Sequence, residues 1–251
     1  QAITYFGYLS VQPTYARKQL YCNIVSSLVS SGNWSLLDRL WITAAADLST
    51  ALTDLVTGAK AVVHGSCTFT ADHGFTGDGT SCYIDTGFNP ATQGVQYTLN
   101  SAHLTAWNLT SRTAGPASGL WALGGANSGS PNYLTMAPLA ASSTSYFNIH
   151  ESTNAQPVVS NVNGFWALVR TSSTVIGIYQ NSTNISPASL ASTAVPNASV
   201  AILALNQNGT VNSWSPDQVA EFGFGAALDA THEGTYYSAV HTYMQAVAGI
   251  P

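Results

Sequence analysis

From residue 65 onward, short apolar runs recur between clusters of Gly, Pro, Asn and Ser. This feature constrains the fold most, because brief strands separated by frequent turn signals are typical of a β-sandwich or β-barrel. A single all-β domain can use most of a chain of 251 residues. The predicted strands are Cys67–Ala71, Ser81–Thr86, Val95–Leu109, Gly119–Leu123, Tyr133–Met136, Ser145–His150, Phe165–Arg170, Thr174–Gln180, Val200–Asn206 and Val219–Gly225.

The long run Val95–Leu109 shows how deeply the sheet should be buried. Tyr97, His103 and Trp107 share one face at the period of two that a strand requires, and Leu104 lies on the other face. Bulky or apolar residues on both faces predict a strand that is covered on both sides.

Two further signals complete the predicted sandwich. Asn208-Gly209 follows a strand-like run and predicts a type I′ hairpin turn. After Asp229 the spacing changes to that of a helix, which we expect to lie on the sandwich as a closing element. Its apolar side consists of Tyr236, Val240, Met244 and Val247.

The first 63 residues carry a helical pattern. The stripe of Leu20, Ile24 and Leu28 predicts a helix over about residues 14–31. We therefore divide the chain into a helical attachment region, residues 1–63, and a β-sandwich with its closing helix, residues 64–251.

Two shorter helices are expected in the same region. Ser35 and Asp38 resemble a capping box, which predicts a second helix that continues through Trp41. A third helical run covers about residues 46–57. Short helices of so few residues bury little apolar surface by themselves. We therefore expect them to pack on the sandwich or on a neighbouring chain.

The low content of charge excludes several classes of partner. Only 7% of residues are charged, and six Lys plus Arg stand against eleven Asp plus Glu. Such a chain has no basic stripe with which to displace counterions, so we expect no binding of nucleic acid. No apolar run approaches the length of a membrane span, and residues 1–10 lack the regions of a secretion signal.

The chain has three cysteines, Cys22, Cys67 and Cys82. An odd number argues against a disulfide framework. Cys67 and Cys82 bracket a predicted hairpin and could pair in an oxidising compartment. We expect buried free thiols instead.

Three segments resemble a known class of domain. The run Phe75–Phe88, FTGDGTSCYIDTGF, resembles the early strands of concanavalin A-like (laminin-G-like) jelly-roll domains. The pair Gly164–Arg170 and Val175–Tyr179 and the closing stretch Gln218–Leu228 fit the same pattern, although Gln180 and Asn181 stand where the family has a shorter turn. The resemblance implies an antiparallel jelly-roll β-sandwich, which the sequence extends by a short helical N-terminal region and a C-terminal helix.

The helical segment Leu28–Trp41 directly before this domain resembles structural proteins of tailed bacteriophages. That resemblance implies a head-decoration, fibre or tail-associated protein on the virion surface. Its expected partners are other virion proteins, further copies of itself and host-surface glycans. A free-standing carbohydrate-binding lectin and a glycan-degrading hydrolase or lyase are the alternatives.

Four aromatic residues near predicted loops are candidates for glycan binding, because sugars bind to aromatic faces beside amide and carboxylate groups. These residues are Trp121, Tyr133, Tyr146 and Trp214. Packing in the sandwich core is the alternative for each of them.

The acidic residues do not form a catalytic pattern. Glycoside hydrolysis requires two carboxylates in one cleft, and strands supply them at spacings of two or four. Of the three glutamates, Glu151, Glu221 and Glu233, we weigh Glu221 as half of a pair with Asp217, which lies four residues before it but in a turn outside the strand. We therefore expect no enzyme activity.

We expect no cofactor, and calcium is the one possible exception. Asp78 lies between two glycines and is best explained as a turn residue whose side chain binds nearby backbone. As a calcium ligand it would have Asp85 as its second carboxylate.

Overall fold

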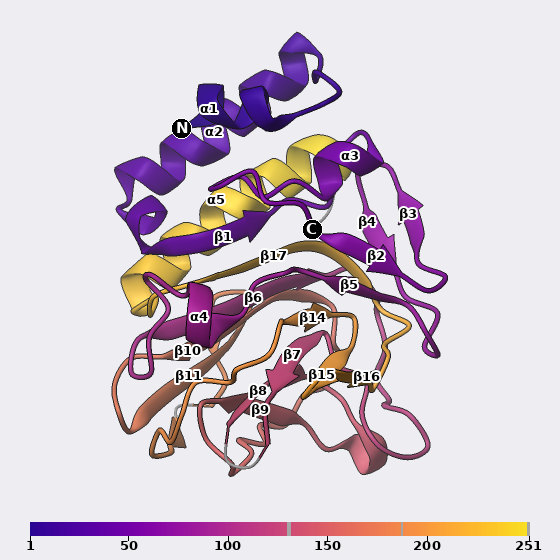
Figure 1. The fold of residues 1–251 in the computed structure, drawn as a ribbon, viewed down its shortest axis with the longest axis vertical. Coiled ribbons are helices and arrows are strands. Elements are labelled where there is room, and N and C mark those ends of the chain that lie inside the picture. The colour runs from indigo at the N-terminus through magenta and orange to yellow at the C-terminus, as the bar shows by residue number, and fades with distance from the viewer. Residues whose placement is uncertain (130–131, 187, 250–251) are drawn as a thin grey trace.

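The computed structural model describes residues 1–129, 132–186 and 188–249. The chain forms three layers, in which helices lie on a nine-stranded sheet and that sheet faces an eight-stranded one (Figure 1). This arrangement confirms the predicted mainly antiparallel β-sandwich with N-terminal helices and a C-terminal helix. The helices are α1 (Ala2–Tyr8), α2 (Tyr15–Ser30), α3 (Leu48–Ala51), α4 (Pro90–Gln93) and α5 (Ala230–Ala248), with 3₁₀ turns at Asn33–Leu36 and Ala141–Ser143.

The nine-stranded sheet lies in the middle of the molecule. Its main path runs β12-β11-β10-β6-β17-β4-β3, while β1 pairs with β17 and β13 with β11. The strands are β1 (Leu37–Trp41), β3 (Thr68–Thr70), β4 (Gly74–Thr76), β6 (Ala102–Asn108), β10 (Gly164–Arg170), β11 (Val175–Gln180), β12 (Thr183–Asn184), β13 (Ala188–Ser189) and β17 (Gln218–Gly225).

The eight-stranded sheet forms the outer layer opposite the helices. Its path runs β16-β15-β7-β14-β5-β2, and β8 joins β7 to β9. All of its pairs are antiparallel except β15 with β7. The strands are β2 (Val62–His64), β5 (Tyr83–Asp85), β7 (Gly124–Asn127), β8 (Tyr133–Ala137), β9 (Tyr146–Ile149), β14 (Ala201–Ile202), β15 (Leu205–Gln207) and β16 (Thr210–Asn212).

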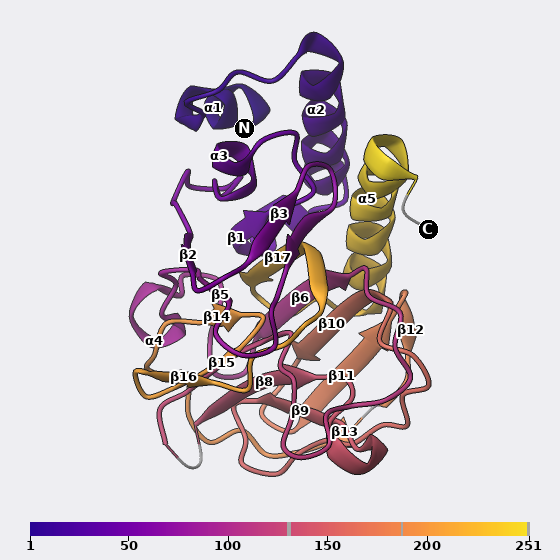
Figure 2. The same ribbon diagram turned by 90° about the vertical axis from the view of Figure 1, so that its right-hand side faces the viewer.

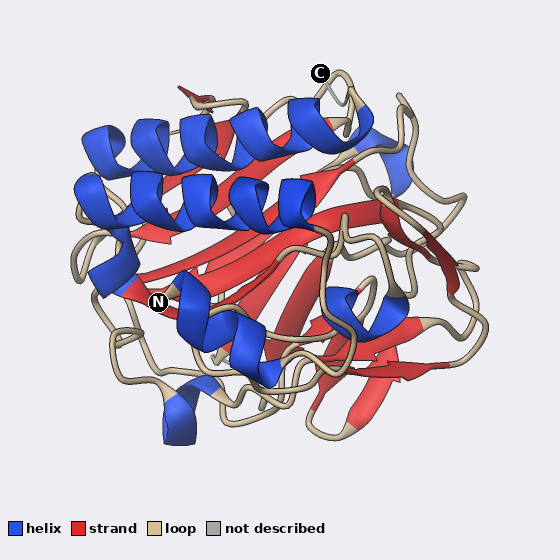
Figure 3. Ribbon diagram, turned by 90° about the horizontal axis from the view of Figure 1, so that it is seen from above, coloured by secondary structure: helices blue, strands red, loops and turns tan. Residues whose placement is uncertain are grey.

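The two long helices lie side by side across the nine-stranded sheet (Figures 2 and 3). The Asp229 carboxylate accepts hydrogen bonds from the first-turn amides of α5, which begins the helix where the sequence predicts it. Tyr236, Val240 and Met244 are fully buried between α5 and the sheet, so the predicted apolar side is confirmed.

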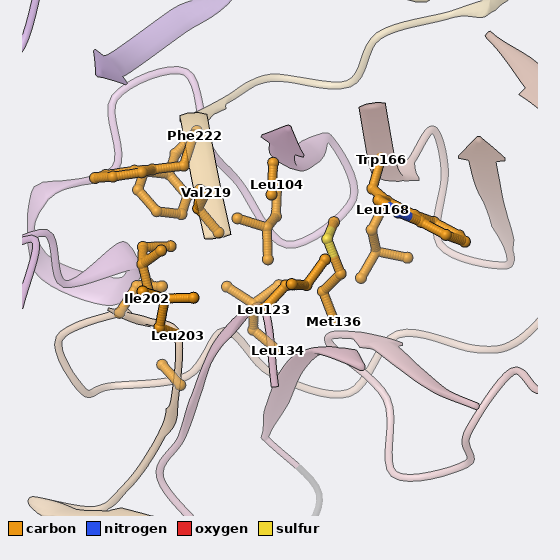
Figure 4. Close-up of a cluster of buried hydrophobic side chains, with 14 of the residues drawn as sticks. Leu104, Leu123, Leu134, Met136, Trp166, Leu168, Ile202, Leu203, Val219 and Phe222 are labelled. Atoms are coloured by element: carbon orange, nitrogen blue, oxygen red, sulfur yellow. The ribbon is translucent and has the colours of Figure 1, made fainter. Parts of the chain in front are cut away.

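A second apolar core lies between the two sheets (Figure 4). Leu104 of β6 and Trp166 of β10 meet Leu134 and Met136 of β8 across this core. Every residue of β6 is buried, because Ala102, Leu104 and Ala106 face this core while Trp107 faces the helices. The prediction that this strand is covered on both sides is therefore confirmed.

The predicted second helix is wrong. Residues Leu37–Trp41 form the strand β1, which pairs antiparallel with β17. A bulge between Leu37 and Arg39 interrupts the alternation of the strand. Both Leu37 and Leu40 therefore join the core under the helices, and their spacing imitates that of a helix.

Other boundaries also differ from the prediction. The helix expected over 46–57 is reduced to α3, and α1 was not predicted. Only the second half of Val95–Leu109 is a strand, and Gly119–Leu123 is not one. The hairpin turn is confirmed, because Asn208 and Gly209 both have positive φ between β15 and β16.

Cys67 and Cys82 form a disulfide, with Cα atoms 5.0 Å apart. The expectation of free thiols at these two positions is wrong, because the hairpin brings the cysteines within bonding distance. Cys67 precedes β3 in one sheet and Cys82 precedes β5 in the other, so the bond ties the two layers together. Cys22 is free and half-buried.

Among the described residues, no helix is both long and apolar enough to cross a membrane.

Candidate functional site

Two of the four aromatic candidates lie on the outer face of the eight-stranded sheet. Tyr133 begins β8 and Tyr146 begins the adjacent β9. Both are half-buried. The residues that follow them, Leu134 and Phe147, point into the core between the sheets. Alternation therefore turns the two tyrosines to the opposite, outer face.

The register of the sheet arranges polar residues beside them in rows. Gln207 of β15 pairs with Asn127 of β7, and Asn127 pairs with Tyr133. In the next row on this face, Thr135 of β8 pairs with Asn148 of β9. Residues that are far apart in the chain thus form one polar surface across four strands.

A groove of about 160 Å³ lies on this surface. Thr135 and Asn148 are buried in its floor, whereas Asn154 is exposed. Leu205 lies over Gly125, where an added Cβ would be 2.7 Å from Leu205 Cδ1, so this glycine makes room for it. The lining residues are Leu120, Asn127, Tyr133, Thr135, Tyr146, Asn148, Asn154, Leu205 and Gln207.

In three side-chain amides of the groove, one polar group forms a hydrogen bond within the protein and the other has no partner among the described residues. Asn127 Oδ1 accepts from the amide of Gly129 at 2.7 Å, and Gln207 Oε1 accepts from Asn212 Nδ2 at 2.6 Å. The amino groups of Asn127 and Gln207 therefore remain as free donors within the described residues. Asn148 donates to the carbonyl of Glu151 at 3.5 Å and keeps its own Oδ1 as an acceptor.

The hydroxyls of the groove add to this set. Those of Tyr133, Tyr146 and Thr135 form no hydrogen bond within the described part of the chain, and neither does the amide of Asn154. The groove thus offers donors, acceptors and two aromatic rings, and the two phenols are the only ionisable groups among its described lining residues.

The amide and hydroxyl residues of the groove were missed in the sequence. A signal was present, because Tyr-x-Thr in β8 and Tyr-x-Asn in β9 place polar residues at alternate positions of two apolar strands. The sequence does not show that β8 and β9 are neighbours in this register, nor that β15 supplies Gln207.

Trp121 and Trp214 do not line the groove. Both are half-buried, and the guanidinium of Arg112 lies 4.9 Å from the Trp121 ring centre. The segments of the two tryptophans are joined by a hydrogen bond from the amide of Ala122 to the carbonyl of Ser213.

The two acids that were weighed as a catalytic pair are fully buried. Both carboxylate oxygens of Asp217 accept from Arg112, at 2.8 and 2.9 Å. Glu221 lies under α5, where it accepts from Thr105 and Tyr236, and burial raises its pKa to about 7. Neither acid lines the groove.

Asp78 acts as the turn residue that the sequence suggests. Its carboxylate accepts hydrogen bonds from the hydroxyl of Ser81 and from the amides of Ser81, Cys82 and Thr80, which hold its pKa well below the usual range. Asp85 accepts from the amide of Gly87 at 2.9 Å.

The sequence gives Asp78 and Asp85 as possible calcium ligands. Among the described residues, no group of three acidic, histidine or cysteine side chains converges on one point. Calcium takes six to eight oxygen ligands, so these two carboxylates would provide only part of a site. Calcium binding stays a prediction.

No family model and no curated protein matches the chain. Solved structures do match. A mutant sialidase of Trypanosoma rangeli with trans-sialidase activity superimposes with a TM-score of 0.63 at 14% identity, covering 92% of this chain and 40% of the sialidase. Domain 4 of AbnA, an extracellular arabinanase of Geobacillus stearothermophilus solved with arabinotriose, gives 0.56 at 11% identity, covering 80% of this chain and 98% of that domain.

The receptor binding domain of a botulinum neurotoxin C/D mosaic serotype matches with a TM-score of 0.59 at 8% identity, covering 82% of this chain and 51% of that domain. These identities are low enough that the likeness concerns the fold alone. The chain spans well under half the length of the sialidase that it matches. Fold and likeness together define only the class of fold, a mainly antiparallel β-sandwich with N-terminal helices and a C-terminal helix.

Proposed function

We propose that the protein binds carbohydrate, and that the sugar lies in the groove formed by β7, β8, β9 and β15. The observation that supports this proposal is the convergence of Tyr133 and Tyr146 with unused amide and hydroxyl groups in one groove. Trp121 and Trp214 are not part of the proposed site.

The chemistry of the groove suits a sugar. A pyranose or furanose ring presents C–H groups on its faces and hydroxyls around its edge, so it combines aromatic contact with hydrogen bonding at fixed positions. The free donors of Asn127 and Gln207 and the free acceptor of Asn148 would bind such hydroxyls. An arabinotriose-bound domain and a sialidase share the fold, which agrees with this proposal.

We further propose that the protein acts by binding and does not cleave its ligand. Glycoside hydrolysis requires a carboxylic acid and a carboxylate on opposite sides of the bond that is broken. Within the described part of the chain no acidic residue lines the groove, and Asp217 and Glu221 are enclosed elsewhere in the fold.

Substitution of the two tyrosines tests the proposal. The wild-type protein should bind at least one oligosaccharide on a broad glycan array, and titration calorimetry should then show that Tyr133→Ala and Tyr146→Ala each weaken binding about tenfold. An aromatic contact of ~1.4 kcal/mol corresponds to that factor.

Tyr15→Ala is the matched control, because Tyr15 is 79% exposed at the start of α2, away from the groove. It should leave the dissociation constant unchanged. Unchanged unfolding midpoints would show that the groove variants remain folded. Binding that survives the double tyrosine substitution, or no glycan binding by the wild type, would refute the proposal.

The finer role stays a separate proposal. The resemblance of Leu28–Trp41 implies a virion structural protein. Such a protein would be exposed on the particle, contact other virion proteins and assemble with its own copies. None of the structures compared above is a virion protein. The Cys67–Cys82 disulfide supports an oxidising, extracellular location.

A further inference from the structure

We infer that the groove selects uncharged oligosaccharides and excludes sugars that carry a carboxylate. This inference rests on the proposed function and specifies its ligand class. Its starting point is the lining, which consists of three asparagines, one glutamine, one threonine, two tyrosines and two leucines. Such a surface can bind hydroxyls, but it has no cation for an acidic sugar.

The cations of the chain are all engaged elsewhere. The whole sequence has six Lys plus Arg, and all six lie in the described residues. Each arginine forms an ion pair: Arg17 with Asp72, Arg39 with Asp54, Arg112 with Asp217, and Arg170 with Glu151. Lys18 lies over the ring of Phe6, and Lys60 donates to Thr53.

The histidines do not replace them, because none of the six lines the groove. His150, which directly follows β9, is buried, with its ring nitrogens 2.7 Å from the carbonyl oxygen of Leu99 and 2.8 Å from the hydroxyl of Tyr97. Burial lowers the pKa of His150 to about 4, so it is neutral at pH 7.

Glu151, the charged residue nearest to the groove in the sequence, is neutralised by Arg170. Glu151 binds Asn148 through its backbone carbonyl, while its carboxylate accepts from the amide of Ile149 at 2.7 Å and from Arg170. Arg170 is fully buried, so its charge is not available to a ligand. A sugar carboxylate in the groove would lose hydration without gaining a counter-charge, which is unfavourable.

The position of the tyrosines indicates a ligand of more than one sugar unit. Ala137 pairs with Tyr146, and Tyr133 lies four residues before Ala137 on the same strand. Four residues of strand span about 13 Å, so the two tyrosines lie at opposite ends of the β8–β9 pair. A ligand that touches both rings is therefore longer than one sugar ring.

A matched pair of ligands tests this selectivity. A printed array of neutral, sialylated and uronate-containing oligosaccharides identifies the tightest neutral binder. The same oligosaccharide is then oxidised at its primary hydroxyls to carboxylates, which changes its charge and little else. We expect the oxidised form to bind at least about tenfold more weakly, and the dissociation constant of the neutral form to be insensitive to salt.

The possible failures are distinct. Equal or tighter binding of the oxidised form, or of sialylated glycans, would overturn the selectivity and leave carbohydrate binding intact. Binding of no oligosaccharide at all would overturn the proposed function itself.

A charge added to the groove provides a second measurement. Asn154 is exposed at the groove, so Asn154→Lys supplies the missing cation without loss of a buried contact. This variant should bind the oxidised ligand about fivefold more tightly than the wild type, with a gain that shrinks at high salt. Gln245→Lys on the exposed side of α5 adds the same charge away from the groove and should give no gain. An equal effect of both variants, or of neither, would overturn the role of the missing counter-charge.

Discussion

Glu221 is an acid enclosed in the fold under α5. Its Oε1 accepts from Thr105 at 2.8 Å and from Tyr236 at 2.7 Å, while Oε2 has no hydrogen-bond partner in the described residues. Burial disfavours the charged form and raises its pKa from 4.5 to about 7. The folded protein therefore binds the proton more tightly than the unfolded chain, so the free energy of unfolding contributed by this group falls as the pH rises from about 4.5 to 7.

Glu221→Gln should remove that dependence on pH. The shift corresponds to about 3 kcal/mol, so the variant should gain about this amount relative to the wild type between pH 5 and pH 8, as measured by urea unfolding. His103 and His150, whose pKa values burial lowers to about 4, act in the opposite direction but are present in both proteins. Their effect cancels in the comparison. A stability difference that is constant over this pH range would contradict the raised pKa of Glu221.

The strand β1 shows how an element can differ from its local pattern. Leu40 belongs to the core under the helices, whereas Trp41 joins the core between the sheets and stacks on Phe222 at 4.9 Å. The strand is thus apolar on both faces, so its sequence lacks the alternation that identifies an exposed-edge strand. Its closeness to β17 depends on Gly225, where an added Cβ would lie 2.0 Å from the carbonyl oxygen of Leu36.

Gly225→Ala should therefore push β1 away from β17 and lower the free energy of unfolding by about 2 kcal/mol, because overpacking against backbone cannot be relieved by a side-chain rotation. Gly7→Ala in α1 is the control, since nothing lies within 4 Å of its added Cβ. It should be neutral or slightly stabilising in a helix. If chemical denaturation shows Gly225→Ala to be as well tolerated as Gly7→Ala, β1 does not lie where it is described.

The whole molecule is held together by two apolar cores and one covalent link. One core joins the helices to the nine-stranded sheet, and the other joins that sheet to the eight-stranded one. The Cys67–Cys82 disulfide connects the two sheets across 15 residues of chain. A bond of this kind stabilises mainly by restricting the unfolded chain.

Reduction of the disulfide should lower the free energy of unfolding by about 3 kcal/mol, which is the loop-closure contribution for a loop of this length. Urea unfolding with and without dithiothreitol measures it, and the Cys67→Ser/Cys82→Ser protein should match the reduced wild type. Cys22→Ser should respond to the reductant as the wild type does, because Cys22 is not part of the bond. An unfolding midpoint that does not depend on the reductant would argue against the disulfide in solution.

Much of the fold could be predicted from the sequence, but only part of the candidate site could. Strands with clear turn signals at their ends, such as β10 and β11, were found nearly at their observed bounds, as was α5 behind its Asp229 cap. Tyr133 and Tyr146 were found as candidates because aromatic residues near loops are visible in sequence. Their polar neighbours were not, because no local signal links Gln207 to Tyr133.

By itself, then, the sequence determined the alternation of strands and turns, the closing helix and the low content of charge, since caps, turn residues and composition act locally or additively. Tertiary structure alone decided the rest. The groove exists because cross-strand register brings Asn127, Asn148 and Gln207 beside the two tyrosines. Likewise β1 is a strand because it has β17 beside it, and pairing with a distant strand outweighs a local helical spacing.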